Sequence, residues 1–186
     1  MGRGPWGAFI SRFSAYDMVV IGLIAALGIA SKNIVGPLAH LVTVPIGVPG
    51  GSLAGGFYML WIVLARAFTG KAGSSTLAAA VQAIIVIATG SFGSHGALTV
   101  ITYTLPGIAC DLAMIPHKKD GEGRLLWCAL GGMAANIAGS VATNYTFFRL
   151  PPLALALTAV TAAFSGAAGG AFASAASDRL GKIMGR

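Results

Sequence analysis

The stretch Leu150–Ser177 reads LPPLALALTAVTAAFSGAAGGAFASAAS and contains no charged residue. A helix that crosses a bilayer needs about 20 predominantly apolar residues, and this stretch is long enough. A second charge-free stretch, LLWCALGGMAANIAGSVATNYTFF, covers Leu125–Phe148, and a third, MVVIGLIAALGIAS, covers Met18–Ser31. Continuous apolar runs of this kind indicate membrane-spanning helices rather than the short alternating strands of a membrane barrel.

The composition of the whole chain leads to the same class of protein. Of its 186 residues, 56% are hydrophobic and only 9% are charged, and the mean hydropathy is +0.82. A soluble domain carries about 25% charged residues. These values exclude a soluble enzyme, a disordered chain, a coiled coil and a disulfide scaffold. We expect the two cysteines, Cys110 and Cys128, to be free buried thiols.

We predict an all-α integral membrane protein that forms a single transmembrane domain over residues 1–186. Charged residues, prolines and glycines divide it into six spanning helices, at about 16–35, 51–68, 74–90, 97–116, 125–145 and 152–177. We expect the N-terminal residues to stay attached rather than form a cleaved signal peptide, since Asp17 is unusual in front of an apolar run.

The distribution of positive charge predicts the topology. With both termini inside, ten of the twelve lysines and arginines lie on the cytoplasmic side, and Lys32 and Arg149 lie outside. This asymmetry follows the positive-inside rule, so the net charge of +7 does not call for a nucleic-acid partner. Residues 36–50 are rich in glycine and proline but apolar, which predicts an outside loop. This loop is either a lid over a ligand or a re-entrant connector.

Polar residues of four predicted helices lie at similar depth toward the outer face. At 1.5 Å per residue they sit roughly 9 to 13 Å below the outer ends of their helices. Amides can hydrogen-bond a heterocycle and aromatic rings can stack on it, so the pattern predicts a site for a small flat organic ligand. Hydrogen bonding between helices is the alternative. The candidate substrate-binding residues are Tyr58, Trp61, Gln82, His95, Tyr103, Asn136, Ser140, Thr143 and Asn144.

The sequence offers little chemistry for an enzyme. It has no Walker motif, no Gly-x-Ser-x-Gly, no His-Glu-x-x-His and no cluster of its three histidines. We therefore predict no catalytic residue, no metal site and no cofactor. Asp111 lies near the cytoplasmic end of its helix, where we expect it either to pair with a basic residue such as Arg66 or Lys71 or to contact a partner.

Small residues recur four apart in the first helix, at Gly22, Ala26 and Ala30. This spacing lets another helix approach closely, either from a partner or from the same protein. The last helix repeats the pattern at Ala162, Gly166, Gly170 and Ser174, where packing within the protein is favoured.

Together these features resemble the S component, the substrate-binding membrane subunit, of an energy-coupling factor (ECF) vitamin transporter. The run GFYMLW at Gly56–Trp61, followed by Lys71-Ala72-Gly73, Gln82 and Gly90, resembles the second and third helices of these proteins. The run FSGAAG at Phe164–Gly169, leading to Ser177–Leu180, resembles the last helix of the thiamin-precursor (YkoE-like) group.

The resemblance implies a prokaryotic cytoplasmic-membrane protein that works with a transmembrane coupling subunit and two cytoplasmic ATPases. Such a protein captures a vitamin or vitamin precursor from outside and topples within the membrane to release it. It also implies that Gly22, Ala26 and Ala30 contact the coupling subunit. Thiamin binders of this type use acidic residues in the outer site, where this sequence has Gln82, Asn136 and Asn144. A neutral precursor such as a pyrimidine, or another vitamin, fits these amides better.

Two other functions stay open from the sequence. A stand-alone secondary carrier or small channel would transport without an ATPase, but the sequence shows no inverted repeat. A structural subunit of a larger membrane complex would bind no ligand.

Overall fold

The computed structural model describes residues 5–43, 50–90, 98–117 and 121–185, and these residues are helical with short connections and no strand. The elements are α1 (Pro5–Ile10), α2 (Ala15–Thr43), α3 (Gly50–Thr69), α4 (Ser74–Thr89), α5 (Leu98–Ala113), α6 (Arg124–Thr143), the π-helical turn η2 (Asn144–Phe148) and α7 (Pro152–Ile183). Four of the helices, α2, α3, α6 with η2, and α7, are long and apolar enough to cross a membrane. The shorter helices α4 and α5 are also apolar. That all six cross the membrane stays a prediction.

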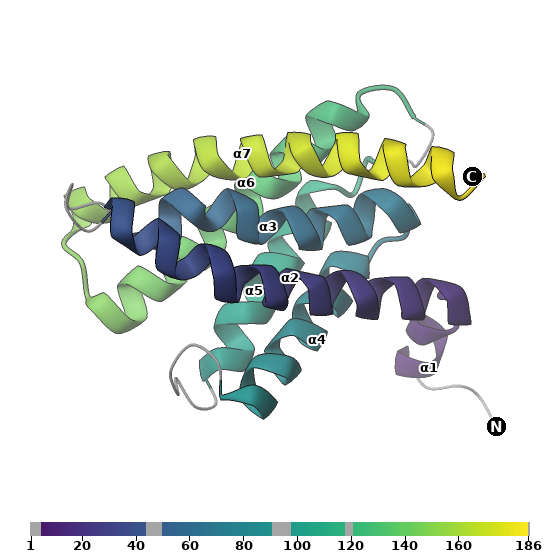
Figure 1. Cartoon of the computed structure of the whole chain (residues 1–186), viewed down its shortest axis with the longest axis horizontal. Coiled ribbons are helices and arrows are strands. Elements are labelled where there is room, and N and C mark those ends of the chain that lie inside the picture. The colour runs from purple at the N-terminus through teal and green to yellow at the C-terminus, as the bar shows by residue number, and fades with distance from the viewer. Residues whose placement is uncertain (1–4, 44–49, 91–97, 118–120, 186) are drawn as a thin grey trace.

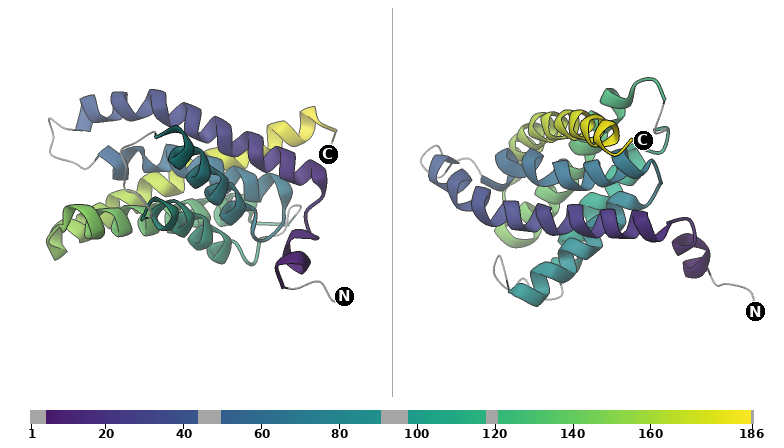
Figure 2. Two further views of the ribbon diagram at one scale, coloured as in Figure 1. Left: turned by 90° about the horizontal axis from the view of Figure 1, so that it is seen from below. Right: turned by 45° about the vertical axis from the view of Figure 1, so that its right-hand side comes forward.

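The long helices pack side by side into one bundle (Figures 1 and 2). Helix α7 contacts both α3 and α6, α2 contacts α3 and α4, and α5 contacts α4 and α6. Helix α1 and the last turn of α7 lie at the same end of the bundle in all three views, and we call this the terminal end. The opposite end is the far end. In the predicted orientation, the terminal end faces the cytoplasm.

The structure differs most from the sequence prediction in the segment that was expected to be a lid. Helix α2 continues through Pro37 as far as Thr43, so the loop prediction is wrong for residues 36–43, whereas 44–49 lie outside the described residues. An apolar segment favours helix because lipid cannot satisfy free backbone groups, and membrane helices tolerate an internal proline. Leu41 is 73% exposed, so most of its side chain is not packed against the described residues.

Glycines hold α7 against its two neighbours without intervening side chains. A Cβ on Gly132 of α6 would overlap the carbonyl oxygen of Gly166 on α7. On the other side of α7, a Cβ on Gly56 of α3 would overlap the carbonyl oxygen of Ser165. Helices in lipid associate through such close packing. The small-residue pattern of the last helix therefore serves packing within the protein.

Large apolar side chains cover the outside of the bundle. Exposed examples from five helices are Leu27, Ile84, Ile101, Leu126 and Phe164. A soluble monomer rarely exposes so much contiguous apolar surface, so this surface suits contact with lipid.

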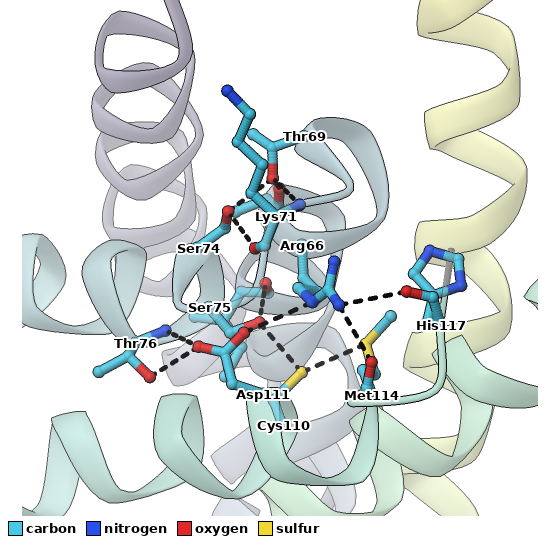
Figure 3. A network of polar contacts seen from close by, with 12 residues as sticks. Arg66, Thr69, Lys71, Ser74, Ser75, Thr76, Cys110, Asp111, Met114 and His117 are labelled. Atoms are coloured by element: carbon cyan, nitrogen blue, oxygen red, sulfur yellow. Dashed lines mark hydrogen bonds and ion pairs between the residues drawn. The ribbon is translucent and has the colours of Figure 1, made fainter. Parts of the chain in front are cut away.

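A buried polar network joins α3, α4 and α5 near the terminal end (Figure 3). Arg66 is 2% exposed, and its Nη2 donates to the carbonyl oxygens of Met114 at 3.1 Å and His117 at 3.3 Å. Its Nε lies 3.7 Å from Asp111 Oδ1. The other carboxylate oxygen of Asp111 accepts from Thr76 N–H at 2.8 Å and Thr76 Oγ1 at 2.7 Å, in the first turn of α4. The predicted pairing of Asp111 with Arg66 is thus confirmed, and the carboxylate also caps α4.

Two further ion pairs lie at this end. Lys71 pairs with Asp17 rather than with Asp111, and this contact ties α2 to the turn before α4. Arg124 Nη1 lies 2.7 Å from Asp178 Oδ1 and joins α6 to α7. Both thiols, Cys110 and Cys128, are free and buried as predicted.

Candidate functional site

A buried lysine lies away from the terminal-end network, on the part of α2 that leads to the far end. Lys32 is only 6% exposed. Its Nζ donates to Gln82 Oε1 at 3.1 Å, and it lies 4.8 Å from the ring centroid of Tyr103 and 5.5 Å from that of Tyr58. Helices α2, α3, α4 and α5 each supply one of these four residues. The sequence pattern predicts Lys32 as a charge on the outer side that flanks a spanning helix, whereas its side chain is buried in the bundle; the side of the membrane stays a prediction.

Gly28, one helical turn before Lys32, lets Gln82 and Trp61 approach α2. A Cβ added to Gly28 would overlap Gln82 Nε2 and would lie 3.0 Å from Trp61 Cγ. Tyr58 and Trp61 are three residues apart and so lie on one face of α3. We call Lys32, Tyr58, Trp61, Gln82 and Tyr103 the lysine cluster. Four of its five members are residues that the sequence analysis proposed for ligand binding.

Within the described part of the chain, no acidic side chain forms an ion pair with Lys32. The ion pairs there involve Arg66, Lys71 and Arg124 but not Lys32. One amide oxygen and the faces of two aromatic rings therefore stabilise its ammonium. A buried charge without a counter-charge is costly, and in membrane proteins such a residue marks a functional site by default.

The cluster also holds hydrogen-bond donors without acceptors. Gln82 is 2% exposed, and its Nε2 has no hydrogen-bond partner among the described residues. The same is true of the indole Nε1 of Trp61. The ammonium of Lys32 has three N–H groups, of which the bond to Gln82 uses one. The unused polar atoms of Lys32, Gln82 and Trp61 described above are thus all donors.

The predicted residues of α6 form a separate polar group. Asn136 Nδ2 donates to the carbonyl oxygens of Ser52 at 3.2 Å and Ala162 at 2.9 Å, and its Oδ1 accepts from Ser140 Oγ at 3.3 Å. These bonds link α3, α6 and α7. Asn144 Nδ2 donates to the carbonyl oxygen of Ser140, within its own helix, at 2.8 Å.

The two remaining predicted site residues join neither group. Thr143 is half-buried at the last residue of α6. His95 lies outside the described residues.

The length of α2 is the feature that the sequence pattern does not reveal. Lys32 directly follows an apolar run, and this position is typical of a charge that flanks the end of a spanning helix. Because the helix continues to Thr43, Lys32 lies well inside it. Gly28 and Lys32, four residues apart, share a face, and this spacing could have drawn attention to Lys32.

The small residues of α2 form an open strip on the surface. A Cβ added to Gly22 would meet no atom within 4 Å among the described residues. Ala26 and Ala30 are exposed, whereas Ala25 and Ile29 face the core. We call Gly22, Ala26 and Ala30 the small-residue strip.

This arrangement of helices matches a known class of membrane protein. The chain is similar to a crystal structure of an S-component of ECF transporter, with a TM-score of 0.76 and 16% sequence identity over 92% of this chain and 87% of that chain. The fold is therefore that of an ECF S component.

Sequence comparison gives the family. Residues 16–138 match the family described as "ABC-type cobalt transport system, permease component", and the chain belongs to this family. A comparison with curated proteins gives no match. The family and fold are those of a multi-pass membrane transport subunit that is not an enzyme.

Proposed function

We propose that the chain is an S component that captures a small, flat, vitamin-like organic molecule at the lysine cluster. The observation that carries this proposal is the set of buried donors on Lys32, Gln82 and Trp61, together with the two aromatic rings that face the ammonium of Lys32. Buried polar groups normally have partners, so unpartnered ones call for an explanation. A ligand that accepts these hydrogen bonds and stacks on Tyr58 or Tyr103 provides one. In the predicted orientation, the cluster lies in the outer half of the membrane.

The small-residue strip is the proposed contact with the coupling subunit. Its open surface allows a partner helix to approach the backbone of α2 closely. Lys32 is buried on another face of the same helix, so partner and ligand would use different faces of α2. Two cytoplasmic ATPases would complete the assembly, and toppling of the S component would then deliver the ligand inside.

Asn136 is better suited to holding helices together than to contacting the ligand. Both of its polar atoms already have partners within the protein. We propose that Ser140 and Asn144 belong to the same support.

The family description names cobalt, so a metal cargo is the second candidate. No three His, Cys, Asp or Glu side chains lie close enough to hold a metal ion in the segments that the structure describes. The ammonium of Lys32 would also repel a divalent cation. These observations favour an organic cargo.

One reconstitution experiment separates the candidates. The chain would be placed in liposomes, alone and with a coupling subunit and its ATPases, and ligand carried through purification would be identified by mass spectrometry. We expect a bound organic molecule and its ATP-dependent uptake by the full assembly only. Uptake by the chain alone would indicate a stand-alone carrier, and accumulation of Co²⁺ would indicate a metal importer. Absence of any ligand and any uptake would favour a structural subunit.

A further inference from the structure

We infer that the substrate carries a carboxylate and that Lys32 is the residue that binds it. This inference rests on the proposed function and adds to it the chemical class of the ligand. The residue lies within α2, close to Tyr58, Gln82 and Tyr103 on three other helices. It therefore contributes a positive charge beside these three residues.

The first argument is charge. In the described part of the protein no acidic side chain pairs with Lys32. Its ammonium is nevertheless buried, which is unfavourable unless an opposite charge arrives. An anionic ligand supplies that charge, whereas a cationic ligand would be repelled by it. The two aromatic rings could otherwise cage a cationic ligand, but the lysine itself already occupies that position.

The second argument is the direction of the free hydrogen bonds. Gln82 Nε2 and Trp61 Nε1 donate to nothing within the described chain, and Lys32 retains unused N–H groups. All of these groups require an acceptor. A carboxylate offers two oxygens with several lone pairs and no donor, so it complements this set better than an amide or an alcohol does.

The third argument is the number of charges. A phosphate carries up to two negative charges and is usually bound by arginine clusters or helix N-termini. The lysine cluster has a single cation, which matches the single charge of a carboxylate. The rings of Tyr58 and Tyr103, both near the ammonium, suit a flat ring attached to that carboxylate.

The test uses matched probes that differ only in the charged group. Nicotinate would be compared with nicotinamide, and 4-aminobenzoate with 4-aminobenzamide, by equilibrium binding to the full-length protein in detergent. We expect each acid to bind the unchanged protein at least about tenfold more tightly than its amide, as the loss of a hydrogen bond to a charged group implies. Lys32→Met should remove this preference, and Lys32→Arg should keep part of it. Lys182→Met, at an exposed position near the terminal end, is the control and should change nothing.

Equal binding of acid and amide, preference for the amide, or failure of both acids to bind would overturn the inference. So would an unchanged acid preference in a folded Lys32→Met protein. The acid-to-amide ratio of the unchanged protein needs no variant, so it decides even if Lys32→Met fails to fold. A neutral molecule that binds and is transported would refute the carboxylate while leaving the proposed function standing. Absence of any ligand and any uptake would refute both.

Discussion

The ammonium of Lys32 donates to the amide oxygen of Gln82 at 3.1 Å, and the amide nitrogen of Gln82 then lies against Gly28 on the same helix as Lys32. One turn of α2 therefore contacts both ends of one carboxamide. The bond to Lys32 fixes which end of the amide is the acceptor, and the nitrogen is left as an unpaired donor. This relationship makes the cluster sensitive to small changes in α2.

Gly28→Ala is expected to weaken ligand binding by about tenfold, or about 1.4 kcal/mol. The added methyl group would overlap the amide nitrogen of Gln82 and crowd the Trp61 ring, so both side chains must move. Because the clash meets the end of a flexible side chain, the protein should still fold. Gly22→Ala, on the same helix but with open space around it, is the matched control. Equal affinities of the two variants for the co-purified ligand would argue against the assigned site.

Replacement of Ala26 and Ala30 by leucine together is expected to reduce uptake by more than about tenfold while leaving ligand affinity unchanged. Both positions are exposed on the small-residue strip, where bulky side chains would keep a partner helix away. Uptake in liposomes and co-purification with the coupling subunit provide the two measurements. Ala168→Leu, exposed on α7, is the control. A parallel fall of binding and uptake would show that the strip has a different role.

Gly170→Ala is expected to destabilise the protein by about 1–3 kcal/mol through overpacking. A Cβ at this position would overlap the carbonyl oxygen of Cys128 in α6, and a backbone cannot move aside as a side chain can. Thermal unfolding in detergent should show a lower midpoint for this variant than for Gly22→Ala. A midpoint equal to that of the unchanged protein would contradict the close contact between α6 and α7.

The stability of the protein is expected to fall as the pH drops from about 7.5 to 5.5, with His117 as one cause. Burial, and then the nearby charges of Arg66 and Arg124, lower the pKa of His117 from 6.5 to about 4. The folded state therefore holds this ring neutral, whereas the unfolded chain takes up a proton below pH 6.5. The stabilisation from the neutral ring is complete above pH 6.5 and is lost progressively between pH 6.5 and about 4.

The measurement is the unfolding midpoint against pH for the unchanged protein and for His117→Gln. The variant has no group that titrates in this range at that position, so its midpoint should depend less on pH. The range from pH 7.5 to 5.5 stays above the ordinary pKa values of carboxylates. Identical pH profiles would remove His117 from the explanation.

The sequence predicted where the helices lie because membrane helices are set by the length of apolar runs, but α2 and α7 continue past their predicted ends, at residues 35 and 177, to Thr43 and Ile183. The ends of α3 and α4 agree with the predicted bounds to within one residue, and Asp111 pairs with Arg66 as expected. A buried charge near one end of a helix has few oppositely charged residues within reach. The positions of the charges in the sequence were therefore enough to predict the partner of Asp111 as Arg66 or Lys71.

The centre of the candidate site could not be predicted in the same way. Whether Lys32 points to water or into the bundle depends on how far α2 continues, and Pro37 hid that continuation. Likewise, polar residues at equal depth need not meet. Gln82 and Tyr103 both approach Lys32, whereas Asn136 turns toward α3 and α7 and satisfies its own hydrogen bonds there. The rotation of each helix about its own axis decides whether such residues meet, and a single sequence does not specify that rotation.

The backbone contacts that α7 makes with α3 and α6 have a mechanical consequence. Where glycine lies directly on a neighbouring carbonyl, there is no layer of side chains that could shift rotamers and let the helices slide. These three helices should therefore tilt as one stiff block when the protein reorients. We therefore expect any hinge that loads or empties the site to lie among α2, α4 and α5, which supply Lys32, Gln82 and Tyr103.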